Sequence, residues 1–68
     1  MSYLILFDIK ELDNATRLRV NRKLRKLSAL MLQQSVWESN NVDELRELVE
    51  SIRLSGGKAL ILEKRVVG

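Results

Sequence analysis

The sequence contains no cysteine, no histidine and no proline, and these absences exclude several kinds of site. Without cysteine there is no disulfide and no thiolate zinc site, and without histidine there is no imidazole metal ligand and no Ser-His-Asp triad. We expect residues 1–68 to form a single cytoplasmic domain, since the lack of cysteine fits a reducing compartment. A domain this small buries too little surface to be very stable alone. Oligomerisation is the remaining means of stabilisation, so we expect a homodimer.

Long hydrophobic runs are also absent. The apolar run Leu4–Phe7 is far shorter than the about 20 residues that a membrane span requires, and we expect no membrane association. The run also lacks the basic segment and the small-residue cleavage site of a signal peptide. The pair Gly56 and Gly57 is not followed by the Lys-Ser/Thr pattern of a phosphate-binding loop, so it predicts the end of a helix.

The basic residues are concentrated in one segment. Half of the 12 lysines and arginines lie between Asn14 and Ser28, where there is no acidic side chain. Such a block is typical of a phosphate-binding surface, although a solvated helix face is the alternative on charge alone. The segment contains Arg17, Arg19, Arg22, Lys23, Arg25 and Lys26, of which we expect Arg17, Arg19, Arg22, Lys23 and Lys26 to bind nucleic acid.

Hydrophobic periodicity predicts the first strand and the first helix. Tyr3–Ile9 is apolar at every position except Asp8, as in a central strand that is covered on one face and packed on the other. Asp13 or Asn14 then offers an N-cap for a helix. Apolar residues follow at spacings of a helical stripe, and they are Val20, Leu24, Leu27 and Met31.

The second half predicts more strands around a second helix. Leu30–Glu38 alternates in polarity and holds either both middle strands or one long bent strand. Asn41 and Glu44 form a capping box, and Ala59–Val67 is a last strand. The predicted fold is therefore an α+β, ferredoxin-like βαββαβ sandwich with an antiparallel sheet and two helices on one face. The stripe of the second helix is Leu45, Leu48, Val49 and Ile52.

Asp8 is the strongest candidate for chemistry. It ends an apolar strand at the loop edge of the sheet, where a carboxylate can hold a hard cation such as Mg²⁺. The alternative is that Asp8 starts a polar loop and accepts backbone N–H bonds. One carboxylate is a poor metal site, but a two-fold axis near this strand would add a second Asp8. Metal-assisted phosphodiester hydrolysis is thus the enzyme chemistry that the composition leaves open.

Trp37 is the only tryptophan of the chain. It follows Gln33 and Ser35 in the predicted strand region, where it could stack on a base or fill a core or a dimer interface. A lone tryptophan in so small a protein is more often a packing residue, and packing is the interpretation that we favour.

Three consecutive segments resemble the CRISPR-associated protein 2 family. That family opens with a hydrophobic strand ending in aromatic-Asp, which Tyr3–Ile9 matches, and continues with a basic helix. A Gln-x-Ser-Val-aromatic-Glu strand follows, and residues 33–38 read Gln-Gln-Ser-Val-Trp-Glu. A capped acidic helix and a further strand complete the similarity over nearly the whole chain. Met31 stands where many members have arginine.

The resemblance implies a ferredoxin-like homodimer that acts in CRISPR adaptation, or spacer acquisition. There it bridges two copies of the integrase subunit along the DNA duplex to be captured. Some members are metal-dependent endonucleases on RNA or DNA, so the resemblance implies a Mg²⁺ ion shared across the dimer. By position, Asp8 would be the catalytic and metal-binding residue, paired with its counterpart in the other subunit. Phe7, Ser35 and Trp37 would support it.

Two other functions stay open at this point. The virulence-associated VapD-type toxin ribonucleases share the aromatic-Asp strand and the fold. A non-catalytic protein-interaction module, docking through its sheet edge or its acidic helix, would also suit the opposite charges of the two helices.

Overall fold

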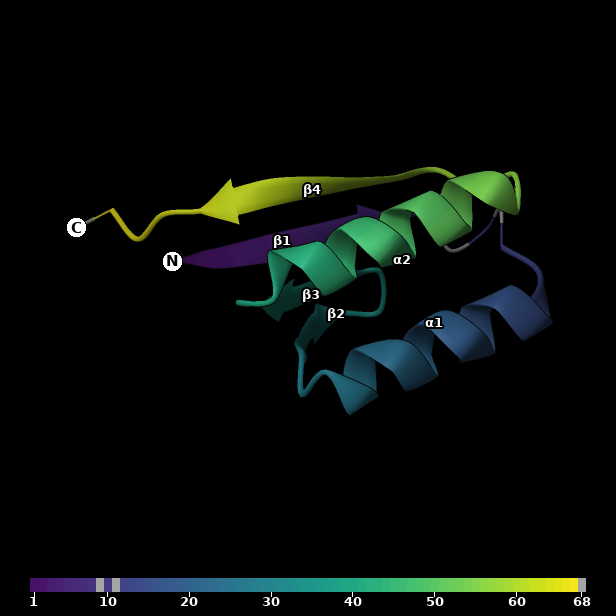
Figure 1. Ribbon diagram of the computed structural model, residues 1–68, viewed down its shortest axis with the longest axis horizontal. Coiled ribbons are helices and arrows are strands. Elements are labelled where there is room, and N and C mark those ends of the chain that lie inside the picture. Colours follow the sequence, from purple (N-terminus) through teal and green to yellow (C-terminus); the bar gives the residue numbers. More distant parts are fainter. Residues whose placement is uncertain (9, 11, 68) are drawn as a thin grey trace.

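The computed structural model describes residues 1–8, 10 and 12–67. Strands and helices follow one another in the order βαββαβ, as Figure 1 shows. The elements are β1 (Ser2–Phe7), α1 (Asn14–Lys26), β2 (Leu30–Gln33), β3 (Val36–Ser39), α2 (Val42–Leu54) and β4 (Ala59–Lys64).

The four strands form one antiparallel sheet in the order β2-β3-β1-β4. The most apolar strand, β1, lies at the centre, where it pairs with β3 on one side and with β4 on the other. The two helices lie on the same side of the sheet (Figure 1). The predicted ferredoxin-like α+β fold is therefore confirmed.

Alternation along the strands decides which side chains meet the helices. Ile5 of β1 is fully buried, and its partners across the sheet are Trp37 of β3 and Ile61 of β4. These residues share the helix-covered face with Phe7. The core that forms there contains Ile5, Phe7, Val20, Leu24, Trp37, Leu45, Leu48, Val49, Ile52 and Ala59.

Side-chain caps fix the start of each helix. Asp13 is the N-cap of α1, and its carboxylate accepts the Thr16 backbone N–H at 2.7 Å, a bond that lowers the pKa of Asp13. Asn41 caps α2 by accepting the Glu44 N–H at 3.3 Å. The N–H of Asn41 donates to the Ser39 hydroxyl at 3.0 Å, so Ser39 occupies the place that Glu44 would take in a full capping box.

The glycine pair ends α2, as predicted. Gly56 has φ of +86°, a conformation that side chains with a Cβ rarely adopt. Gly57 is required for a different reason, because a Cβ there would lie 2.7 Å from Leu12 Cδ2 and 2.8 Å from Ile52 Cγ2. The chain can thus turn tightly from α2 into β4.

The structure corrects the predicted end of the first helix. Met31 was predicted on the apolar stripe of α1, but α1 ends at Lys26 and Met31 lies in β2. Ser28 takes a positive φ of 59°, and the Ala29 N–H donates to the Leu24 carbonyl at 3.0 Å. This left-handed residue turns the chain out of the helix before Met31.

Three strand boundaries also differ from the prediction. Residues 30–39 form both middle strands, joined by a turn at Gln34 and Ser35, and this resolves the alternative of one bent strand. The last strand was predicted to reach Val67 but ends at Lys64, beyond which the sheet offers it no partner among the described residues. The first strand ends at Phe7, and Ile9 lies outside the described residues.

Candidate functional site

Hydrogen bonds to two neighbouring segments hold the end of β1 in place. The Phe7 N–H donates to the Ser35 carbonyl at 3.1 Å, and the Asp8 N–H donates to the Lys58 carbonyl at 3.1 Å. Ser35 belongs to the turn between β2 and β3, and Lys58 directly precedes β4. The backbone of Asp8 is therefore fixed, although it lies just past the end of the strand.

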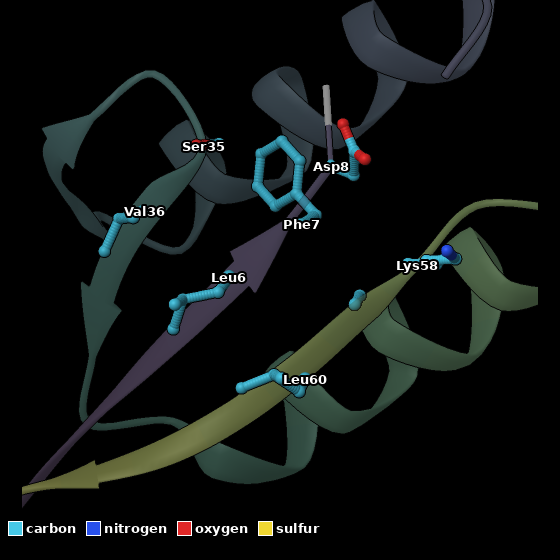
Figure 2. Close-up of a pocket in the computed structure, with 8 residues that line it drawn as sticks. Leu6, Phe7, Asp8, Ser35, Val36, Lys58 and Leu60 are labelled. Carbon is cyan, nitrogen blue, oxygen red and sulfur yellow. The ribbon is translucent and has the colours of Figure 1, made fainter. Parts of the chain in front are cut away.

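The Asp8 side chain itself is exposed. One carboxylate oxygen, Oδ1, accepts the Lys10 backbone N–H at 3.1 Å, as in an Asx turn. The side chain lies at the rim of a shallow pocket of about 320 Å³, across from Lys58 (Figure 2). The lining residues are Leu6, Phe7, Asp8, Ser35, Val36, Lys58, Ala59 and Leu60.

The Asp8 side chain is of the kind that can bind a magnesium ion. Its second oxygen makes no hydrogen bond among the described residues, and carboxylate oxygen is the ligand that Mg²⁺ prefers. Within residues 1–8, 10 and 12–67, however, no three His, Cys, Asp or Glu side chains gather closely enough to hold a metal ion. Asp8 is therefore not part of a three-residue ligand cluster within the described part of the chain.

The three predicted supporting residues differ in position. Phe7 and Ser35 both line the Asp8 pocket, with the Phe7 ring buried toward the helices. Trp37 lies in the core, and its indole N–H donates to the Gln34 carbonyl at 3.4 Å. The packing interpretation of Trp37 agrees with this position, because a buried ring has no face available for a base.

Four of the predicted basic residues share one stripe of α1. Their spacing of three, one and three residues places them on adjacent turns of a helix. Arg19 and Lys23 lie on the side toward α2, since Arg19 donates to the Ser51 hydroxyl at 3.5 Å and Lys23 lies 3.8 Å from a Glu44 carboxylate oxygen. The basic stripe, as we call it below, consists of Arg19, Arg22, Lys23 and Lys26.

Arg17 and Arg25 lie outside the basic stripe. Arg17 bonds the Asn14 side chain at 2.8 Å on the flank of α1 that faces away from α2. Arg25, three residues after Arg22 and eight after Arg17, lies between these two on the exposed side of α1, given the helical period. The cations of α1 therefore extend from the side beside α2, across the exposed side of the helix, to Arg17 on the flank that faces away from α2.

The second face of the sheet is apolar and is not covered by a helix. Leu4 and Leu6 of β1 lie on this face, opposite Leu62 and Leu60 of β4, and Val36 of β3 lies beside Leu6. Leu60 and Leu62 are each 47% exposed. We call these five residues the open face. Sequence analysis did not identify it, although leucines at alternate positions of both strands carry the signal.

A polar cluster lies at one end of the open face. Glu38, whose side chain is only 17% exposed, accepts the Ser2 hydroxyl at 2.7 Å and the Lys64 ammonium at 3.1 Å. The hydrogen bond from Ser2 and then the contact with Lys64 lower the pKa of Glu38. The cluster joins three strands at the end of the sheet opposite to Asp8.

The sequence matches one known family. Residues 1–60 match the family model described as CRISPR associated protein Cas2, which covers every element except the end of β4 and the residues after it. No curated protein matches the chain. Within the described residues, neither helix has the length and apolar composition to cross a membrane.

The lowered pKa of Glu38 predicts that the fold loses stability in acid. Its pKa is lowered on folding, so ionised Glu38 stabilises the fold. This contribution to the free energy of unfolding is present above the ordinary pKa of 4.5 and is lost as the pH falls through the pKa of the folded state. Glu38→Gln should flatten the decrease in the urea midpoint below pH 4.5, whereas Glu63→Gln, a change at a more exposed carboxylate near the same end of the sheet, should retain it. An unchanged acid profile in Glu38→Gln would contradict the assignment.

Proposed function

The chain belongs to the CRISPR-associated protein 2 family, and we propose that it acts as a homodimer in spacer acquisition, binding nucleic acid on its basic helix. Its function is therefore a CRISPR-associated one. The observation that carries the dimer proposal is the open face, which presents leucines of two strands to solvent.

Pairing of two open faces would remove these leucines from water. Exposed contiguous apolar surface on a small protein usually marks an interface. Apolar burial contributes about 25 cal/mol per Å², a gain that a domain with so small a core needs. A second copy therefore supplies the cover that the helices supply on the other face.

The same pairing would bring two carboxylates to one interface. Asp8 follows Leu4 and Leu6 at alternate positions, so its side chain continues the open-face side of β1. A two-fold axis that crosses the open face near this end of β1 would place the two Asp8 carboxylates in one groove. Each Asp8 would then add a second carboxylate to the metal site that the other Asp8 begins.

In that dimer, the two Asp8 side chains would hold a Mg²⁺ ion, together with water and phosphate oxygens. When bound, the ion would stabilise negative charge on a phosphodiester and activate water for its hydrolysis. The protein's contribution is to fix Asp8 through the bonds from Phe7 and Asp8 to the flanking segments. Leu6 and Leu60 line the pocket beside Asp8, and pairing of two open faces would cover these two side chains.

The basic stripe is the proposed phosphate contact. Arg22 and Lys26 make no ion pair among the described residues, so both are available for phosphates. Lys23 is partly engaged by Glu44, and it therefore contributes less. We propose DNA or RNA as the ligand, the integrase subunit of the CRISPR system as the protein partner, and the cytoplasm as the location.

The dimer proposal predicts a mass near twice 7.9 kDa in light scattering. The double variant Leu60→Lys/Leu62→Lys should elute as a folded monomer, because pairing would bury four unpaired charges. Leu54→Lys is the matched control, since Leu54 is exposed on α2 and should leave the dimer intact. A wild-type monomer, or a dimer that survives the double variant, would refute open-face pairing.

If the protein binds nucleic acid through phosphate contacts, its affinity should fall strongly as the salt concentration rises. Each phosphate contact contributes about 0.9 to the slope of log affinity against log salt on duplex DNA. Arg22→Gln/Lys26→Gln should therefore reduce the slope by about 1.8 for each copy of the helix that contacts the duplex. Arg46→Gln on α2 serves as control, and an equal effect there would exclude the basic stripe as the binding surface.

The metal proposal separates cleavage from binding. Asp8→Asn, and EDTA with the wild-type protein, should each abolish cleavage of RNA or DNA while affinity for the duplex is retained. The fold should survive, because the Asp8 side chain is exposed and its structural bond to Lys58 is made by the backbone. If Asp8→Asn still cleaves and Asp43→Asn does not, the metal site would lie on α2 and the proposal for Asp8 would be wrong.

A further inference from the structure

Lys58 lies opposite Asp8 in the sheet. Phe7 pairs with Ala59 in the antiparallel ladder of β1 and β4, so the next pair of the ladder is Asp8 with Lys58. The hydrogen bond from the Asp8 N–H to the Lys58 carbonyl at 3.1 Å continues this pairing past the ends of both strands. In a regular ladder, opposed residues project to the same face, with Cβ atoms about 5 Å apart. Lys58 is therefore on the same face as Asp8.

The alternation along β4 places Lys58 on the same face independently. Leu60 and Leu62 of the open face follow Lys58 at alternate positions, whereas Ala59 is buried in the core. Asp8 and Lys58 are both exposed, and both line the shallow pocket of about 320 Å³ (Figure 2). This end of the open face thus carries a carboxylate and an ammonium group beside an apolar surface.

Lys58 is the cation of this pocket. Among the described residues that line it, Lys58 is the only lysine or arginine, and all others except Asp8 and Ser35 are apolar. The basic stripe lies on α1, which covers the opposite face of the sheet (Figure 1). A phosphate group at Asp8 would therefore meet the positive charge of Lys58 and not that of the basic stripe.

The charge balance of the proposed metal site requires such a cation. Two Asp8 carboxylates would balance the two positive charges of one Mg²⁺ ion, so that the metal and its protein ligands together would be neutral. A phosphodiester brings one further negative charge into the site, where the carboxylates repel it. A lysine ammonium offers a compact positive charge with three N–H donors, which suits a phosphate oxygen.

We propose that Lys58 binds the phosphodiester of the nucleic acid at the Asp8 site. This inference rests on the proposed function and deepens it, because it names a residue that recognises the substrate where the metal would bind. Asp8 and Lys58 lie past the ends of β1 and β4, so they are at the end of the open face. In the dimer, two Lys58 side chains would flank the pair of Asp8 carboxylates.

The alternative is that Lys58 only balances the charge of the Asp8 carboxylate. In either role, loss of the ammonium group should strengthen Mg²⁺ binding at Asp8, because two cations repel each other. Binding of a phosphate group separates the two roles. It should weaken on loss of the ammonium only if Lys58 contacts the phosphate.

The test uses thymidylyl-thymidine, a dinucleotide with a single phosphodiester, added to the full chain with Mg²⁺ and followed by NMR. Lys58→Gln should weaken dinucleotide binding about tenfold, because it removes a charge-assisted hydrogen bond, and should strengthen Mg²⁺ binding about twofold or more. Lys58→Arg should restore most of the dinucleotide affinity. The fold should survive, since the Lys58 bond to Asp8 is made by the backbone carbonyl.

Two controls isolate the contact. Lys10→Gln is the matched variant, since Lys10 is exposed and close to Asp8 in sequence but does not line the pocket, and it should bind the dinucleotide as the wild type does. The same dinucleotide with an uncharged methylphosphonate linkage should bind the wild type weakly, and Lys58→Gln should not change its affinity.

The outcomes separate this inference from the proposed function. Equal dinucleotide affinity of the wild type and Lys58→Gln, or an equal loss in Lys10→Gln, would overturn the role of Lys58 while Mg²⁺ binding at Asp8 still stood. A wild type whose Asp8 signals do not respond to Mg²⁺ would refute the metal site, and the inference for Lys58 with it.

Discussion

The structure depends on one constraint, which is that both helices cover the same face of a four-stranded sheet. Packing against that face places Ile5, Trp37 and the apolar stripes of the helices in a single core. The strands alternate, so the same arrangement turns Leu4, Leu6 and their neighbours on β4 toward solvent. In the proposed dimer, a second copy would cover that second face and stabilise a chain that has no disulfide.

The position of Asp8 follows from the same constraint. The carboxylate lies where the open face ends, on a backbone that is fixed by the β2–β3 turn and by the start of β4. No three metal-ligating side chains gather there among the described residues, and in the proposed dimer pairing across the open face would add a second Asp8. The basic stripe lies on the helix side of the molecule, so a duplex bound by α1 and a metal held at the sheet would contact different surfaces of the dimer.

Much of the fold could be predicted from local chemistry. Caps, glycines and apolar periodicity located both helices, since these signals act within a few residues. The end of α1 was missed because Ser28 adopts a left-handed conformation for which glycine is the usual signal, and Met31 happened to continue the period. Asp8 was recognised by its place at a strand end. Which cations lie beside α2 depends on where α2 packs. The leucines at alternate positions of β1 and β4 are visible in the sequence, but that these two strands are neighbours depends on the sheet order, which no local pattern encodes.

The most direct test of the account is the distance between equivalent positions in two copies. The natural chain has no cysteine, so spin labels can be attached at Asp8→Cys alone or at Leu54→Cys alone. Face-to-face sheets pack about 10 Å apart, so dipolar spectroscopy should find the Asp8 labels close together and the Leu54 labels, beyond the helices, far apart. Closer labels at Leu54 than at Asp8, or no coupling at either position, would contradict it.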